Sequence, residues 1–150
     1  MFQRKIFLMK NYETKELKEL MDYVGKTLMN KMDCSYETWL NIFQTESKLK
    51  RTNQIKSREL YQKLSEEDRK MLLTIIRRVC FNVIYSLLRE SQESQAGFPD
   101  ALYFAARKDN IEYPNIANNS DGLCGEIHLD DGWYEMFFRY FEPDDRLWYE

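Results

Sequence analysis

The residues that could do nucleophilic chemistry in this chain are three cysteines and a single histidine. A nucleophilic cysteine needs a base within hydrogen-bond reach, and the nearest pair in the sequence is Cys124 and His128. The alternating pattern from Leu123 to Leu129 predicts a β-strand, in which residues four apart lie roughly 13 Å from each other. That distance is too long for a cysteine–histidine pair, and a zinc site needs more ligands. We therefore expect no catalytic residue, no metal site and no cofactor here.

Acidic residues gather near the C-terminus, at Asp130–Asp131 and again at Glu142, Asp144 and Asp145. Neither group has the Asp-x-Asp-x-Asp-Gly spacing of a calcium loop, so we interpret both as turn formers and solvated charges. Two further acids, Glu126 and Glu135, would face each other across a hairpin, but nothing in the sequence marks either as buried, as a glycosidase pair requires. The residue types therefore indicate a protein that is not an enzyme.

Basic residues are concentrated in a stretch from Lys48 to Arg58. Nucleic-acid surfaces usually combine such charges with interleaved aromatic side chains and a basic domain. This stretch has no aromatic residue and the whole chain has a net charge of −3. We expect a solvated helix face and no direct binding of nucleic acid.

The first two thirds of the chain have helical periodicity. Apolar residues recur at helical spacing over 13–32, with Thr14 as a cap, and again over about 36–50, with Asp33–Ser35 as a break between them. The clearest element is 66–92, which begins with Ser65 and acidic residues and is apolar around most of its circumference. A helix that is apolar nearly all round is buried, so we expect this one to be central. A partner-binding face on it is the alternative.

The pattern changes after this helix. We expect a short helix over 101–108, a long loop over 109–121, and then two alternating runs, 123–129 and 133–141, joined by Asp130-Asp131-Gly132. An Asp-Gly pair between two strand-like runs is a strong hairpin signal. The predicted fold class is α+β, mainly helical, with a central buried helix at about 66–92 and a C-terminal antiparallel β-hairpin.

Length and composition limit the organisation of the chain. Its 150 residues favour a single domain over 1–150, and 15% aromatic residues provide material for a core. An odd number of cysteines without a recognisable secretory signal favours reduced thiols and the cytoplasm. No run of 18 uncharged apolar residues occurs, so we expect no membrane span.

The charge is distributed unevenly along the chain. Residues 1–64 hold 13 basic and 8 acidic residues, whereas residues 121–150 hold 2 basic and 9 acidic residues. The C-terminal fifth therefore has a net charge of −7. Such asymmetry is typical of proteins with a charged partner, although acidic tails also serve solubility alone.

Two segments resemble a known class of proteins. Residues 65–79, SEEDRKMLLTIIRRV, and 121–140, with DGLCGEIH and DGWYEMFFRY, resemble small bacterial immunity-type proteins of polymorphic toxin systems. The resemblance covers less than a third of the chain and includes no catalytic residue. It implies a small cytoplasmic protein that binds and inhibits a protein partner.

The leading hypothesis is therefore a non-enzymatic binding protein, most concretely an immunity protein that neutralises a cognate bacterial toxin. Its expected partner is a protein, for example a basic domain of that toxin. The expected partner-binding residues lie at the acidic end of the chain: Asp130, Asp131, Trp133, Glu142, Asp144 and Asp145. An inhibitor of a bacterial defence system, encoded by a phage or mobile element, is one alternative. A small enzyme with a pocket near the 109–121 loop is another. The partner's identity and the oligomeric state, including self-association through 36–50, stay open.

Overall fold

A computed structural model describes residues 14–46, 48–93, 100, 102–120 and 122–148. Its helices and strands follow in this order: α1 (Lys15–Gln44), α2 (Thr52–Lys63), α3 (Glu66–Glu93), β1 (Ala106–Lys108), β2 (Ile111–Tyr113), η2 (Ile116–Asn119), α4 (Leu123–His128), α5 (Trp133–Phe137) and η3 (Pro143–Trp148). The predicted fold class, α+β and mainly helical, is confirmed. The positions of several elements differ from the prediction.

The first helix is one continuous element where two were expected. The predicted break at Asp33–Ser35 is wrong, because each polar side chain there has a partner that suits a helix. Asp33 is buried and accepts hydrogen bonds from the backbone N–H of Arg139 at 3.0 Å and from its Nε at 3.2 Å. Ser35 donates to the carbonyl of Lys31, one turn back. The predicted cap is confirmed, since Thr14 accepts from the N–H of Leu17.

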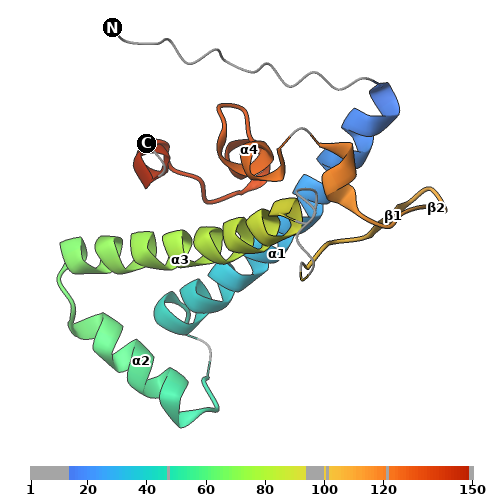
Figure 1. The fold of residues 1–150 in the computed structure, drawn as a ribbon. Helices are drawn as coiled ribbons and strands as arrows, with labels where there is room; N and C mark the ends of the chain where they lie inside the picture. The colour runs from blue at the N-terminus through green and yellow to red at the C-terminus, as the bar shows by residue number, and fades with distance from the viewer. Residues whose placement is uncertain (1–13, 47, 94–99, 101, 121, 149–150) are drawn as a thin grey trace, which may run out of the picture.

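Helix α3 lies between α1 and the C-terminal part of the chain, as Figure 1 shows, with α4 above it and α1 crossing below. Its start is as predicted: Ser65 accepts from the N–H of Asp68 at 3.1 Å. The prediction that it is buried nearly all round is wrong. Among the described residues it buries four side chains, Arg77, Phe81, Leu88 and Ser91, and leaves the opposite face open.

The β-hairpin lies elsewhere than expected. Strands β1 and β2 pair antiparallel in the register Ala106↔Tyr113 and Lys108↔Ile111, so the helix predicted over 101–108 is wrong, as is the reading of 109–121 as loop throughout. The two residues between the strands, Asp109 and Asn110, have φ values of 51° and 63°. Two successive positive φ values are the requirement of a type I′ turn, which matches the twist of a two-residue hairpin.

Where the hairpin was predicted, over 123–141, the structure has the short helices α4 and α5. Asp131, with a φ of 58°, and Gly132 form the turn between them. A Cβ atom at Gly132 would lie 2.6 Å from the carbonyl oxygen of Leu129. The Asp-Gly pair is therefore a real turn signal, but it joins two helices.

Two clusters of apolar side chains form the core. The main cluster joins α1, α3, η2, α4 and α5 and includes Leu20, Met21, Met29, Leu88, Leu123, Ile127, Trp133 and Tyr134. A small second cluster, Ile42, Phe43 and Tyr61, attaches α2 to the end of α1. In Figure 1, α2 lies below α1 and α3.

By length and hydropathy alone, α3 could cross a membrane, since an 18-residue window of it has a mean hydropathy of 1.6. Arg77 and Arg78 stand in the middle of this apolar stretch, where a bilayer makes charged side chains costly. In this fold Arg77 is buried against acidic side chains of η3 and the residues just before it. We therefore treat α3 as a core helix with one uncovered face.

Candidate functional site: the acidic C-terminal lobe

The C-terminal lobe, residues 122–145, carries all six predicted partner-binding residues. A buried ion pair helps to fix its shape. Asp145 is 1% exposed and Arg77 of α3 is 4% exposed. Arg77 donates to Asp145 from Nε at 3.2 Å and from Nη2 at 3.3 Å. A bidentate pair of this kind fixes both position and orientation. The pair therefore anchors the residues before η3 to the middle of α3.

Three further groups complete this network. The hydroxyl of Tyr134 donates to Asp145 at 2.8 Å, and the backbone N–H of Glu142 donates to it at 3.1 Å. On the other side, Arg77 donates to the hydroxyl of Tyr36 on α1 at 3.3 Å. Burial alone would lower the pKa of Arg77, but the bonds to Tyr36 and Asp145 outweigh it and raise the pKa. For Tyr36 burial has the opposite sign, because it disfavours the charged phenolate. It raises the pKa of Tyr36, and the hydroxyl stays protonated.

A second set of polar contacts ties the lobe to α1. Besides its bonds to Asp33, Arg139 pairs with Glu37 at 2.7 Å. The hydroxyl of Tyr140 donates to the same Glu37 carboxylate at 2.8 Å, and the Arg139 guanidinium lies 5.6 Å from the Tyr140 ring centre. The lobe is thus attached by charged contacts to both long helices.

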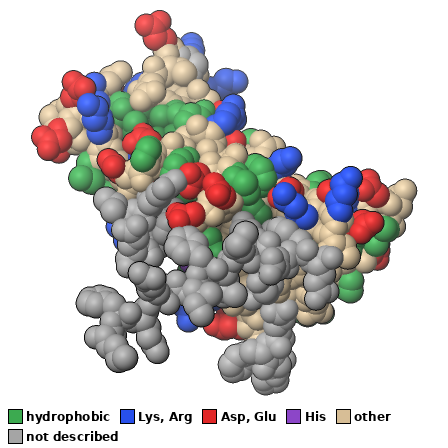
Figure 2. Space-filling model, turned by 90° about the horizontal axis from the view of Figure 1, so that it is seen from above, with side chains coloured by type: hydrophobic (Ala, Val, Ile, Leu, Met, Phe, Trp, Pro, Cys, Tyr) green, Lys and Arg blue, Asp and Glu red, His purple; other side chains and the backbone are tan. Residues whose placement is uncertain are grey.

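The predicted partner-binding set divides into two groups in the structure. Trp133 and Asp145 are in the interior, with 0% and 1% of their surface exposed, so the expectation that they contact a partner is wrong for this conformation. Asp130, Asp131, Glu142 and Asp144 are exposed. The Tyr134–Asp145 hydrogen bond brings the two acidic stretches into one lobe. Figure 2, which views the molecule from above, shows acidic side chains next to hydrophobic ones on the upper face.

Trp133 has a structural role that its sequence position did not indicate. Its ring lies on Gly25 of α1, where a Cβ atom would be 2.5 Å from ring carbons. Its indole Nε1 is buried and has no hydrogen-bond partner among the described residues. The absence of a side chain at Gly25 lets α1 and α5 approach closely enough to enclose the indole.

Comparisons of the chain with models of protein families, with curated proteins and with solved structures found no match.

The cysteine and histidine of the lobe are closer together than the strand prediction implied. Because α4 is a helix, Cys124 and His128 are one turn apart, and Nδ1 of His128 contacts the carbonyl oxygen of Cys124. The thiol is hydrogen-bonded with Tyr85, yet burial raises its pKa. A raised pKa keeps the sulfur protonated, which is the opposite of what activates a nucleophile. Within the described residues, no three potential ligands gather at a metal-sized site.

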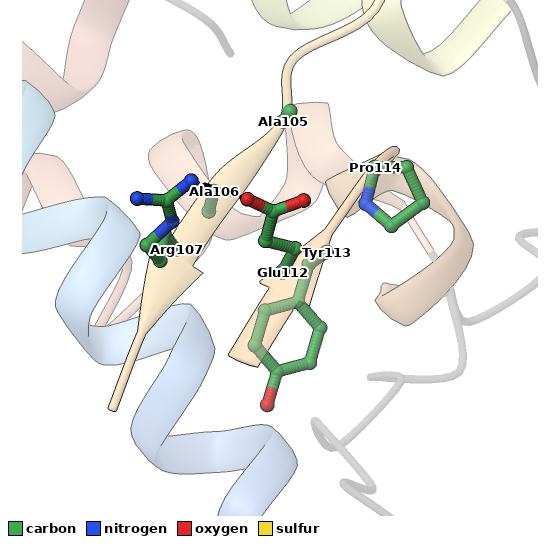
Figure 3. Close-up of a pocket in the computed structure, with 6 residues that line it drawn as sticks. All are labelled: Ala105, Ala106, Arg107, Glu112, Tyr113 and Pro114. Atoms are coloured by element: carbon green, nitrogen blue, oxygen red, sulfur yellow. Dashed lines mark hydrogen bonds and ion pairs between the residues drawn. The ribbon is translucent and has the colours of Figure 1, made fainter. Parts of the chain in front are cut away.

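A cavity does lie beside the hairpin, where a small enzyme would have its pocket. It has a volume of about 450 Å³ and is lined by Ala105, Ala106, Arg107, Glu112, Tyr113 and Pro114. Figure 3 shows the guanidinium of Arg107 and the carboxylate of Glu112 pointing toward each other across the two strands, and they form an ion pair. Glu126, one of the two acids considered above, lies instead in α4, buried and hydrogen-bonded by Ser120 at 3.1 Å. Within the described residues, neither this cavity nor Glu126 favours an enzyme over a binding protein.

Proposed function

We propose that this chain is a non-enzymatic binding protein that neutralises a bacterial toxin by covering a basic surface on it with the C-terminal lobe. The observation that carries the proposal is the set of exposed acids, Asp130, Asp131, Glu142 and Asp144, on a lobe fixed by the Arg77–Asp145 pair. A charged surface on a rigid support accelerates encounter with a partner of opposite charge and limits the entropy lost on binding. The immunity-type resemblance of 65–79 and 121–140 supports the same proposal.

The proposal assigns separate roles to the buried and the exposed residues. Trp133 and Asp145 hold the shape, whereas Asp130, Asp131 and Asp144 provide charge at the surface. Glu142 does both, because it is 61% exposed and also pairs with Arg77 at 3.0 Å. Variants that test binding should therefore leave Glu142 unchanged.

The experiment captures partners from the native host at low salt with three forms of the full chain. The first is the wild type, and the second is the triple variant D130N/D131N/D144N. The third is a charge-matched control, E46Q/E59Q/E67Q, which removes three exposed acids from the region around α2. We expect one protein to be retained by the wild type and the control but lost from the acidic-lobe variant, with retention that falls as salt rises.

The captured protein then decides the biological role. We expect it to stop growth when it is produced alone and to be harmless when this chain is produced with it. Equal loss of the partner from both triple variants would refute the acidic lobe as the binding surface. Capture of a component of a bacterial defence system in place of a toxin would favour an inhibitor encoded by a phage or mobile element.

A further inference from the structure

The outer edge of β1 pairs with no other strand in the described part of the chain. In a hairpin with a two-residue turn, the residues that flank the turn, Lys108 and Ile111, exchange both hydrogen bonds, and bonded pairs then alternate along the ladder. Arg107 therefore turns its backbone N–H and C=O away from β2, and Ala105 follows the same alternation. Neither backbone has a hydrogen bond outside the ladder among the described residues. This edge thus offers donors and acceptors to a further strand.

A second cavity lies along this edge, between the hairpin and α1. Its volume is about 240 Å³, and it is lined by the successive residues Ala105–Arg107 and by no residue of β2. Figure 3 shows these residues following one another along β1, with β2 on one side of the strand and α1 on the other. On α1 the lining side chains are those of Tyr23, Val24, Thr27 and Leu28. We call this hollow the α1–β1 groove.

The lining of the α1–β1 groove is mainly apolar. Val24 and Ile116, which both line it, belong to the main core cluster. Arg107 is the one charged residue among those that line the groove, and its guanidinium pairs with Glu112 on the neighbouring strand. The hydroxyl of Thr27 donates to a carbonyl one turn back in α1, at 2.8 Å. The walls therefore offer apolar contact, and the hydrogen bonds open to a ligand are those of the strand edge.

An extended peptide is the ligand that matches both features. Pockets that enclose a whole small molecule have volumes of roughly 300–1,000 Å³, whereas this groove is smaller and continues along an open edge. A peptide that adds a strand to a free edge gains affinity from main-chain hydrogen bonds and specificity from side chains that enter pockets. Tyr23 in the groove, and Leu102 and Tyr103 just before the edge, are between 44% and 58% exposed. They leave further apolar surface for such a ligand.

We propose that the α1–β1 groove binds an extended, apolar peptide segment of another protein. The segment adds a third strand to the sheet and exchanges hydrogen bonds with the backbones of Ala105 and Arg107. One of its apolar side chains occupies the hollow beside Val24 and Ile116. This site is separate from the acidic lobe, because no residue of 122–145 lines the groove.

The probe is a peptide selected with the full chain from a phage-displayed library of random short linear sequences. We expect the selected peptides to share an apolar residue at one position. In an added strand only every second N–H points to the edge, so methylation of alternate peptide amides distinguishes a strand from other binding modes. Calorimetry should show that one alternate set of methyl groups weakens binding about tenfold or more, and that the other set leaves it unchanged. This measurement needs no variant of the protein.

A variant of the groove gives a second measurement. T27W places a large side chain in the groove from an exposed position of α1. T38W is the matched control, because Thr38 is also exposed on α1 and both hydroxyls donate at 2.8 Å to the carbonyl one turn back. We expect T27W to bind the selected peptide about tenfold more weakly or worse. T38W and the lobe variant D130N/D131N/D144N should bind it as the wild type does.

Three outcomes with the peptide would overturn the proposal. They are a selection that enriches no peptide, equal binding by T27W and T38W, and equal effects of the two methylated sets. A fourth outcome concerns the protein alone. If hydrogen exchange at Ala105 and Arg107 slows as the protein concentration rises, together with a doubling of mass, a second copy occupies the edge and the proposal is wrong.

Discussion

Arg77 and Asp145 are 68 residues apart in the sequence, and their side chains meet in the interior of the protein as a bidentate pair. The pair joins the middle of α3 to η3. Three hydroxyl or amide groups, from Tyr36, Tyr134 and Glu142, share the same two charged groups. The Asp145 carboxylate is therefore one of the groups that fix the shape of the acidic lobe.

Replacing that carboxylate should be costly. In D145N the guanidinium of Arg77 stays buried and loses its buried charged partner, keeping only the exposed Glu142, and breaking a buried pair typically costs about 3–5 kcal/mol. We expect a loss of that size in the free energy of unfolding, measured by urea denaturation. The neighbouring variant D144N changes an exposed carboxylate and should stay within about 0.5 kcal/mol of the wild type. Equal effects of the two variants would contradict the buried pair.

The contact of Gly25 with Trp133 predicts that even one methyl group is not tolerated there. In G25A the new Cβ would collide with the indole ring, and overpacking of this kind costs about 1–3 kcal/mol. The variant G122A is the control, because a Cβ at Gly122 meets no atom within 4 Å. Thermal unfolding followed by tryptophan fluorescence would measure both, and an unchanged melting temperature of G25A would disprove the close approach.

The turn between β1 and β2 predicts a stabilising substitution. Asn110 has a φ of 63° and is exposed at the tip of the hairpin, and glycine adopts this conformation without steric cost. We expect N110G to keep or raise the stability of the protein by a few tenths of a kcal/mol and N110V to lower it by about 1 kcal/mol or more, because β-branched residues are strained at positive φ. The denaturation midpoint of N110G should equal or exceed that of the wild type, and the midpoint of N110V should lie below it. The reverse order would exclude a type I′ turn.

The three thiols should differ in reactivity. Burial raises the pKa of Cys80 and of Cys124, so at pH 8 each holds less thiolate than an ordinary cysteine, whereas Cys34 is exposed. Because the thiolate is the reacting form, we expect Cys34 to react with a disulfide reagent at least tenfold faster than the other two. Single-cysteine variants would give the three rates separately. A Cys124 that reacts as fast as Cys34 would refute the raised pKa and reopen the question of an activated thiol.

The sequence predicted the long helices well because their signals are long. The capping residues Thr14 and Ser65 and the apolar periodicity over three or more turns identify α1 and α3. The interruption at Asp33–Ser35 could not be judged from the sequence, since the partner that keeps Asp33 in the helix is Arg139, more than 100 residues away.

Short elements were predicted less well for a physical reason. The residues buried in α4 are Leu123, Glu126 and Ile127, at helical spacing, but in a six-residue window the apolar positions 123 and 127 fit a strand equally well. The actual hairpin has three-residue strands, too short for an alternation to be visible. Its turn residues, Asp109 and Asn110, were the available signal, since both residue types tolerate positive φ.

The candidate site was predicted in part. The acidic surplus of the C-terminal lobe follows directly from composition, and Asp130, Asp131 and Asp144 are at the surface as that reading requires. Sequence cannot distinguish Asp145 from Asp144, because only the fold shows which of two adjacent carboxylates meets Arg77.

The separate attachment of α2 has a consequence for how the protein opens. This helix is held by the cluster around Phe43 and Tyr61, with a 4.6 Å ring stack between them, by the Arg58 bonds to carbonyls near the end of α1, and by Arg69 of α3, which donates to the carbonyls of Tyr61 and Gln62. Such a unit can detach while the main body stays folded, as a cooperative segment of low local stability. We therefore expect α2 to open more often than the main core cluster. Proteases should then cut within α2 before they cut elsewhere in the described residues.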